Sequence, residues 1–310
     1  MPFPAAIVIP TWNRAHLISK AVEAALTQSH PDRLVIVVDD GSQDATKEAL
    51  APYFTLPDFS LIRLARNGGT ARAKNVGILF AGARAITFHD SDDLPHRDKV
   101  LRQAMVMSQP DIGADPCLNW TVVGQTAGAR LQISAVLSYH DLILPDGRQA
   151  TITRELSLLD DLFPNLQMGS SVPGDWTHVN SGLFHPGLFQ RLGGFLDCIE
   201  EDREFRNRLI LAGEILWMIR EPLLTKIETE DSLTQSRVTS YASARRAADR
   251  QKVWDRVRHW RENCQVQPIP ISLESGEIAS ITNAARLGLS QALSSDQAKA
   301  EASRALEAGR

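Results

Sequence analysis

Three carboxylates lie within four positions of the sequence, at Asp90, Asp92 and Asp93. Carboxylates this close repel one another, which raises their pKa values unless a cation neutralises them. Mg²⁺ and Mn²⁺ prefer oxygen ligands, and Mg²⁺ is commonly held by carboxylates together with substrate phosphates. The run therefore predicts a divalent-metal site for a diphosphate ester. The alternative is a structural cluster in which an aspartate only begins the helix that follows Pro95.

Two further polar segments, Thr11-Trp12 and Asp39-Asp40-Gly41-Ser42, directly follow apolar runs. The Asp-Gly pair suits a ligand site, and it is equally typical of a plain turn in which an aspartate accepts a backbone N–H. Trp12 is either a core aromatic residue or a ring that stacks on a nucleobase. Gly68-Gly69, ahead of a helical pattern, would offer free N–H groups to phosphates.

Alternating strand and helix patterns position these residues. Apolar runs without polar alternation indicate strands that are buried on both faces, as in a parallel sheet. The order of strands and helices predicts a doubly wound α/β fold with right-handed crossovers. The predicted strands span 5–10, 34–38, 59–64 and 85–88, and helices begin near 13, 44 and 70.

The polar segments at 11–13, 39–42 and 90–93 each follow one of these strands. In a parallel α/β sheet, ligands bind beyond the carboxyl ends of the strands. We therefore expect the three segments to meet at one edge of the sheet and to form one site.

The composition excludes several classes of protein. The chain has 310 residues and a net charge of -4, which argues against a nucleic-acid-binding protein. Its three separated cysteines argue against a disulfide framework or a structural zinc site. There is no apolar run near the length of about twenty residues that a membrane span needs, and no secretory signal at the start. Without a G-x-G-x-x-G or a P-loop pattern, a dehydrogenase or P-loop enzyme loses its main support.

The rest of the chain is less regular. The pattern predicts strands at 118–123, 177–184 and 215–219, and a helix at 205–212. After residue 236 a basic helix bears Trp254 and Trp260, and an Ala- and Ser-rich helical end follows. The basic helix is expected to pack on the preceding domain, to dock on an anionic membrane surface or to make an oligomer contact.

Five segments together resemble a known family. They are IVIPTWNR, VVDDGSQDAT, NGGTARAKNVGI, FHDSDD and the later GLFHPGLFQRLGGF followed by an acidic pair. This pattern resembles the family 2 nucleotide-sugar glycosyltransferases, which are inverting enzymes with the GT-A fold. The resemblance implies a Rossmann-like, mostly parallel sheet flanked by helices. It implies a catalytic domain over 1–235, with a nucleotide-sugar half (1–110) and an acceptor half (111–235), followed by a C-terminal helical extension (236–310).

On the donor side, the resemblance implies a site for a nucleotide sugar, with a UDP-sugar expected first. Thr11 and Trp12 would line the base, with Trp12 where an aromatic residue stacks. Asp40 would contact the base, and Asp39 would support the turn. Lys74 stands where the family usually has arginine, which keeps the positive charge but loses the planar fork.

The resemblance also implies the metal contacts. Asp92 would hold the ribose hydroxyls and Mn²⁺ or Mg²⁺, Asp93 would hold the metal and through it the diphosphate, and Asp90 would support the loop. Many relatives carry a histidine contact shortly before a Ser-Leu-Ser/Thr sequence. Here Thr229 stands at that position, flanked by two glutamates (Glu228 and Glu230), so either a glutamate replaces the contact or the metal is held more loosely.

On the acceptor side, the resemblance implies that Asp202 is the general base that takes the proton of an acceptor hydroxyl during an inverting displacement. Glu201 and Glu200 are alternatives in the same run. Asn180 and Ser181 are expected to contact the acceptor sugar.

We therefore expect a metal-dependent inverting glycosyltransferase that acts on a saccharide or lipid-linked acceptor in polysaccharide or cell-envelope glycan synthesis. It would add one sugar per encounter, in the cytoplasm, with a peripheral membrane contact through the basic helix and with no nucleic-acid partner. Two alternatives are a catalytically degenerate member that binds a nucleotide or partner, and a sugar nucleotidyltransferase. The latter needs a glycine-rich basic loop after the first strand, where this chain has Thr-Trp-Asn-Arg.

Overall fold

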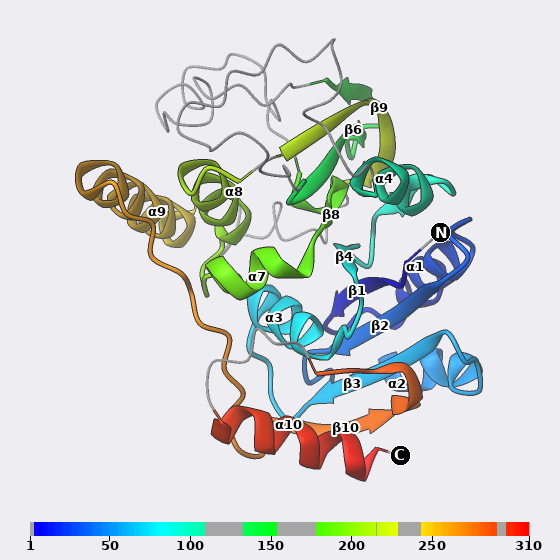
Figure 1. The fold of residues 1–310 in the computed structure, drawn as a ribbon. Coiled ribbons are helices and arrows are strands. Elements are labelled where there is room, and N and C mark those ends of the chain that lie inside the picture. The colour runs from blue at the N-terminus through cyan, green and yellow to red at the C-terminus, as the bar shows by residue number, and fades with distance from the viewer. Residues whose placement is uncertain are drawn as a thin grey trace.

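The computed structural model describes residues 3–108, 133–153, 178–214, 216–228, 243–289 and 296–309. These residues form an α/β fold around one mixed sheet whose strand order is β10-β3-β2-β1-β4-β8-β6-β9-β5, with β7 paired to β6 (Figure 1). The strands are β1 (Ala5–Thr11), β2 (Arg33–Asp39), β3 (Phe59–Leu64), β4 (Ala85–Phe88), β5 (Leu94–Pro95), β6 (Ala135–Ile143), β7 (Gln149–Ile152), β8 (Leu183–Phe184), β9 (Leu216–Ile227) and β10 (Ile278–Thr282). The helices are α1 (Ile18–Leu26), α2 (Thr46–Leu50), α3 (Thr70–Phe80), α4 (Lys99–Met107), α7 (Pro186–Leu192), α8 (Glu201–Leu211), α9 (Ala244–Asn263) and α10 (Asp296–Ala308).

The N-terminal half contains the four predicted strands, and all four are parallel, in the order β3-β2-β1-β4. Alternate side chains of each strand point to opposite faces. Val8 and Ile36 therefore belong to the same apolar cluster as α3, whereas Ile7 and Val35 belong to that of α1. Burial of each such side chain contributes about 1.5–3 kcal/mol, which explains why these strands are apolar throughout.

Helix α3 packs closely on β1 at Gly77. A Cβ atom at this position would lie 2.3 Å from Val8 Cγ1, so only glycine permits the approach. The contact fixes α3, and the polar side chains of its first turns, to the centre of the sheet.

The second half of the sheet is mixed: β8 is antiparallel to β4 and β6, and β9 is parallel to β6. A cluster of buried phenylalanines fills the space between this half and α3, and it consists of Phe88, Phe184, Phe189, Phe195 and Phe205. The predicted strand at 177–184 is mostly wrong. Val179–Ser181 is a single 3-10 turn, and only Leu183–Phe184 pairs as a strand. The expected strand at 118–123 lies outside the described residues.

The C-terminal extension is not only helical, which corrects the sequence-based expectation. Basic helix α9 packs its apolar face, including Val253 and Trp260, against the region of α8. Strand β10 then pairs antiparallel with β3 and extends the sheet (Figure 1). An edge strand exposes unpaired backbone groups, and β10 satisfies those of β3. The division at residue 235 stays a prediction, because residues 229–242 are not described.

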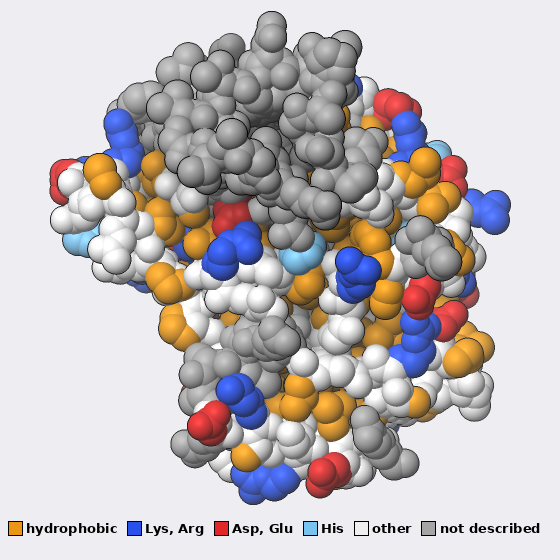
Figure 2. All heavy atoms as spheres, in the orientation of Figure 1, with side chains coloured by type: hydrophobic (Ala, Val, Ile, Leu, Met, Phe, Trp, Pro, Cys, Tyr) orange, Lys and Arg blue, Asp and Glu red, His pale blue; other side chains and the backbone are white. Residues whose placement is uncertain are grey.

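Among the described residues, no helix is both long and apolar enough to cross a membrane. On the face shown in Figure 2, the basic, acidic and hydrophobic side chains of the described residues are interspersed, without a large patch of one charge.

Candidate active site

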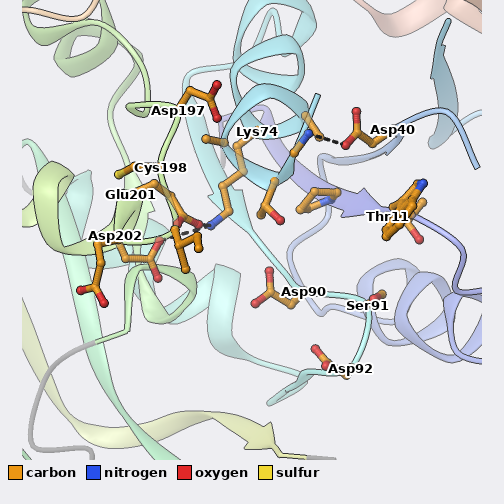
Figure 3. Close-up of a pocket in the computed structure, with 18 of the residues that line it drawn as sticks. Thr11, Asp40, Lys74, Asp90, Ser91, Asp92, Asp197, Cys198, Glu201 and Asp202 are labelled. Carbon is orange, nitrogen blue, oxygen red and sulfur yellow. Dashed lines mark hydrogen bonds and ion pairs between the residues drawn. The ribbon is translucent and has the colours of Figure 1, made fainter. Parts of the chain in front are cut away.

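A cavity of about 670 Å³ lies at the carboxyl ends of β1, β2 and β4 and reaches the start of α8 (Figure 3). The chain runs outward from β1 through β2 to β3 and then returns to add β4 on the other side of β1. This reversal of strand order leaves a crevice between β1 and β4, where open α/β sheets bind ligands. Thr11 at the end of β1 and Asp90 just after β4 both line the cavity.

One end of the cavity, which we call the donor end, contains Thr11, Trp12 and Asp40. The Trp12 side chain is 49% exposed, which excludes the interpretation as a core residue. Thr11 is buried, and its hydroxyl oxygen has no hydrogen-bond partner among the described residues. The donor end therefore offers an open aromatic surface beside polar groups.

Asp40 orders the loop that follows β3. Its carboxylate accepts hydrogen bonds from Gly68 N at 2.8 Å, Gly69 N at 2.7 Å and Asn67 Nδ2 at 2.9 Å. Burial raises the pKa of Asp40 to about 6, against the effect of these backbone N–H groups. The two glycine N–H groups are thus already used, which corrects the expectation that they are free for phosphates.

Asp39 does not line the cavity, so it makes no direct contact with a donor there and instead supports the turn, as the resemblance implies. It is fully buried, accepts a hydrogen bond from Ser42 N at 2.9 Å and pairs with Arg63 Nε at 3.1 Å. For Asp39, therefore, the interpretation as a turn residue is the right one.

The carboxylates of Asp90, Asp92 and Asp93 each offer an oxygen within 4.8 Å of the other two. Burial, followed by the charge of Asp90, raises the pKa of Asp93 to about 7 and also raises that of Asp92. Asp93 Oδ1 is buried and has no hydrogen-bond partner among the described residues. Crowded carboxylates with an unsatisfied buried oxygen fit the ligand set of a hard divalent cation.

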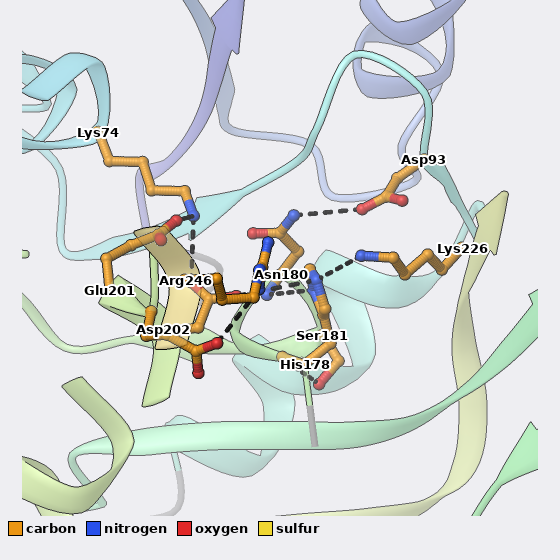
Figure 4. A network of polar contacts seen from close by, with 10 residues as sticks. Lys74, Asp93, His178, Asn180, Ser181, Glu201, Asp202, Lys226 and Arg246 are labelled. Atoms are coloured by element: carbon orange, nitrogen blue, oxygen red, sulfur yellow. Dashed lines mark hydrogen bonds and ion pairs between the residues drawn. The ribbon is translucent and has the colours of Figure 1, made fainter. Parts of the chain in front are cut away.

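Asn180 and Ser181 are fully buried and do not line the cavity, so the structure corrects their assignment to the acceptor. Asn180 Nδ2 donates to Asp93 Oδ2 at 3.2 Å, and Ser181 Oγ donates to the His178 carbonyl at 2.7 Å. Asn180 supports the acidic run from behind, and Ser181 shapes the turn (Figure 4).

The other end of the cavity contains Glu201 and Asp202 in the first turn of α8. We call it the base end, after the general-base role expected of these carboxylates and not after the nucleobase. Acidic residues are favourable there because the N-terminus of a helix carries partial positive charge. Buried Lys74 lies between the two carboxylates, with Nζ 3.2 Å from Glu201 Oε1 and 3.3 Å from Asp202 Oδ1 (Figures 3 and 4). Lys74 does line the cavity, but its ammonium pairs with the base end, which differs from the predicted donor contact.

The neighbouring charges shift the pKa values of Glu201 and Lys74. Burial, and then the charge of Asp202, raises the pKa of Glu201 to about 7, and Lys74 opposes this rise. Burial of Lys74 disfavours its charge, but the carboxylates of Asp202 and Glu201 outweigh burial and raise its pKa. Lys74 is therefore charged at neutral pH, whereas Glu201 is close to half protonated.

Glu200 also lines the cavity, but arginines occupy both of its oxygens. Arg203 Nε lies 2.5 Å from Oε2, while Arg246 Nη1 and Arg250 Nη2 lie 3.3 Å and 3.0 Å from Oε1. Because arginines contact both oxygens, Glu200 does not present either one to an acceptor hydroxyl, which leaves Glu201 and Asp202 as the candidate bases.

Two cavity residues, His178 and Lys226, were not found by sequence reasoning. His178 Nε2 lies 3.8 Å from Asp202 Oδ2 and 2.9 Å from Lys226 Nζ. Burial, and then the charge of Lys226, lowers the pKa of His178 well below its usual value, so the imidazole is neutral at pH 7. Neither residue has a local sequence signal. Thr229 and Glu230 lie outside the described residues.

Comparison with known proteins relates the chain to glycosyltransferases. Residues 6–138, which are less than half of the chain, match the family model for glycosyl transferase family 2. Glycosyltransferase GlyA of Streptococcus pneumoniae serotype 4 is 24% identical over 236 residues, which cover 72% of this chain and 32% of GlyA. Succinoglycan biosynthesis protein ExoO of Rhizobium meliloti is 42% identical over 95 residues, which cover 31% of this chain and 27% of ExoO. The chain thus spans less than a third of each of these relatives.

Similarity to solved structures shows that the chain has the GT-A fold. Residues 1–349 of S. aureus TarS in complex with UDP-GlcNAc match with a TM-score of 0.54 at 17% identity, over 74% of this chain and 60% of that chain. The mannosyltransferase PcManGT of Pyrobaculum calidifontis in complex with GDP-Man and Mn²⁺ matches with a TM-score of 0.50 at 21% identity, over 74% of this chain and 57% of that chain.

Proposed function

We propose that this chain is a metal-dependent inverting glycosyltransferase of family 2. It would transfer a sugar from a nucleoside diphosphate, with UDP-sugars as the first choice, to a hydroxyl group of a saccharide or lipid-linked acceptor. The observation that supports this function best is the single cavity with an aromatic and acidic donor end and a pair of carboxylates at its base end. A sugar bound between the two ends would have a leaving diphosphate on one side and a proton acceptor on the other.

At the donor end, Trp12 would stack on the nucleobase, and Thr11 and Asp40 would line its edge. Base stacking on an aromatic ring contributes about 1–3 kcal/mol in other proteins and is tolerant of the base. The nucleotides in the similar solved structures include both UDP-GlcNAc and GDP-Man, so the test below compares several bases.

Asp92 and Asp93, with Asp90 beside them, would hold Mn²⁺ or Mg²⁺. When bound, such an ion stabilises negative charge on a departing diphosphate. The chain prepares this site because Asn180 donates to one oxygen of Asp93 and leaves the other available.

At the base end, Asp202 would accept the proton of the acceptor hydroxyl at a carboxylate oxygen while that hydroxyl attacks the anomeric carbon. The bond to the diphosphate breaks on the opposite face, so the configuration inverts. Lys74 contacts Asp202 Oδ1, which leaves Oδ2, on the side of His178, for the acceptor proton. Glu201 also pairs with Lys74 and remains the alternative general base.

The acceptor setting is proposed from the relatives. ExoO is named for succinoglycan biosynthesis, which supports polysaccharide or cell-envelope glycan synthesis. A peripheral membrane contact through α9, with the enzyme in the cytoplasm, remains part of the proposal. The apolar face of α9 is used in packing on the catalytic domain, so such a contact would rest on its exposed basic residues.

Nucleotide binding tests the donor site. Calorimetric titration with UDP, GDP, dTDP and their common sugar conjugates, each with and without Mn²⁺, compares the unmodified protein with Asp93→Asn. A matched control is Asp98→Asn, five positions away and outside the cluster of Asp90, Asp92 and Asp93. We expect metal-dependent binding that is weakened at least about tenfold by Asp93→Asn and unchanged by Asp98→Asn. No nucleotide binding under any metal condition would overturn the donor assignment and favour a partner-binding protein.

Turnover then tests the base with the identified donor. Removal of a general base costs about 100-fold to 10,000-fold in rate, so we expect Asp202→Asn to lose activity on that scale while nucleotide affinity is retained. A larger loss in Glu201→Gln than in Asp202→Asn would assign the role to Glu201.

A further inference from the structure

Asn75, on α3 in the N-terminal half of the molecule, connects this half to the loop that precedes α8. Its Nδ2 donates to the Phe195 carbonyl at 2.9 Å, and its Oδ1 accepts from the Phe195 N–H at 2.7 Å. The two residues are 120 positions apart, and both are buried. The amide side chain thus satisfies both backbone groups of one residue, as a neighbouring β-strand would.

The loop is shaped for this contact. Phe195 follows Gly193-Gly194, and a Cβ atom added to Gly194 would lie 2.1 Å from Asn75 Oδ1. Gly193 has a φ of 74°, a conformation that favours glycine. The backbone can therefore approach the Asn75 amide only because Gly194 lacks a side chain, whereas a Cβ atom at Gly193 would meet the Ile269 backbone.

The Phe195 ring packs against two elements that lead to opposite ends of the cavity. Its centroid lies 5.2 Å from that of Phe88, the last residue of β4, two positions before Asp90. It lies 4.5 Å from that of Phe205, on α8 one turn after Glu201. One ring is thus packed between the strand that leads to the acidic run and the helix that bears the carboxylate pair.

We propose that Asn75 is a positioning residue that sets the distance between the acidic run and the carboxylate pair of α8. This inference rests on the proposed function, since it concerns where the general base stands relative to the donor. Helix α3 is fixed to β1 through Gly77, so Asn75 gives a rigid reference point. Two directional hydrogen bonds hold the Phe195 backbone to this helix. A displacement of about 1 Å is enough to cost on the order of 100-fold in rate.

Asn75→Leu tests the inference, because leucine has a similar size but no polar group. Asn207→Leu is a matched control: Asn207 is also buried, and its Nδ2 donates to the Arg203 carbonyl within α8, so it does not connect the halves. Asn75→Asp is a milder variant, since it keeps an acceptor for the Phe195 N–H and loses the donor. It replaces Asn75→Leu if the latter does not fold, as judged by a cooperative thermal transition.

Cys198 reports on the loop without any substrate. It lies three positions after Phe195, lines the cavity and is half-buried, whereas Cys264 is exposed. Burial raises the pKa of the Cys198 thiol, so it reacts slowly with iodoacetamide in the unmodified protein. We expect the alkylation rate of Cys198, followed by peptide mass spectrometry, to rise at least about tenfold in Asn75→Leu as the loop opens locally. The rate at Cys264 should stay unchanged in all variants.

The second measurement is kinetic and uses the sugar nucleotide found by titration. We expect the Kd of the nucleotide with Mn²⁺ to stay within about twofold in Asn75→Leu, since the pairing of β4 with β1 keeps the acidic run in place. The kcat value should fall on the order of 100-fold, because α8 lacks such a pairing. A purely structural role would instead lower stability and leave kcat of the folded fraction unchanged, as we expect for Asn207→Leu.

The outcomes separate this inference from the proposed function. Equal Cys198 rates, or equal kcat values, in Asn75→Leu and Asn207→Leu would overturn the positioning role even if nucleotides bind normally. If the unmodified protein binds no nucleotide, the proposed function is wrong, and Asn75 then has no role in catalysis. The Cys198 rates then still decide whether Asn75 fixes the loop.

Discussion

Replacement of Lys74 by methionine tests the charge balance at the base end. Methionine is apolar, flexible and of similar length, so it fills the same space and removes the ammonium group. Lys74 Nζ is 3.2 Å from Glu201 Oε1 and 3.3 Å from Asp202 Oδ1. At an effective dielectric constant of about 20, each contact supplies about 5 kcal/mol of Coulomb attraction before desolvation is subtracted. Removal of one partner of a buried ion pair costs about 3–5 kcal/mol. We expect Lys74→Met to lose this much free energy of unfolding at a pH where Glu201 and Asp202 are both charged.

The loss should depend on pH because of Glu201, whose pKa is raised from 4.5 to about 7. A carboxyl group with a higher pKa in the folded state holds more protons when folded, so the free energy of unfolding falls as the pH rises between these two values. Without the ammonium, the pKa of Glu201 rises further and the fall continues above pH 7. Near pH 5.5 Glu201 is protonated in both proteins, so Lys74→Met should lose about half as much stability there as near pH 8.5.

Urea unfolding followed by tryptophan fluorescence measures these free energies at about pH 5.5, 7 and 8.5. The matched control is Lys252→Met, because Lys252 Nζ also pairs with a carboxylate, 2.8 Å from Asp249 Oδ1, but its side chain is 66% exposed. We expect a smaller loss in the control, equal at all three pH values. If Lys74→Met loses the same free energy at low and at high pH, the proposed coupling between Lys74 and Glu201 is refuted.

Three further substitutions test other contacts. Trp12→Ala should weaken nucleotide binding by about 10-fold to 100-fold through loss of stacking, as measured by calorimetry, with an unchanged thermal transition because the ring is exposed. Asn180→Leu removes the hydrogen bond to Asp93, so nucleotide binding should need about tenfold more Mn²⁺; an unchanged metal requirement would count against this supporting role. Gly194→Ala places a Cβ 2.1 Å from Asn75 Oδ1 and should lower the free energy of unfolding by about 1–3 kcal/mol in urea.

Much of the donor half follows from local patterns. The apolar runs that form β1, β2, β3 and β4 are buried on both faces, and a parallel arrangement places all their carboxyl ends at one edge. For that reason alone, the sequence predicts that Trp12, Asp40, Asp90 and Asp92 line one cavity, as they do. The acidic pair of α8 was found because a resemblance, and not a periodic pattern, placed it at the acceptor side.

The expectations that failed concern which partner each polar group has. Gly68 and Gly69 are residues typical of a phosphate-binding loop, but Asp40 already accepts hydrogen bonds from their N–H groups. Asn180 has the type of a sugar ligand, but it donates to Asp93 from a fully buried position. The residue type determines which hydrogen bonds a side chain can make. Only its neighbours in the folded structure determine which of these bonds it does make.

The sequence by itself determined the order of strands and helices, the polar segments at the strand ends and the resemblance to family 2, because each depends on residues that are close along the chain. Only the tertiary structure decided that Lys74 faces Glu201 and Asp202, that Asn75 holds Phe195 and that β10 completes the edge of β3. These contacts join segments up to more than two hundred positions apart. They form because a buried charge or backbone group must find a partner, and the packed sheet determines which one lies within reach.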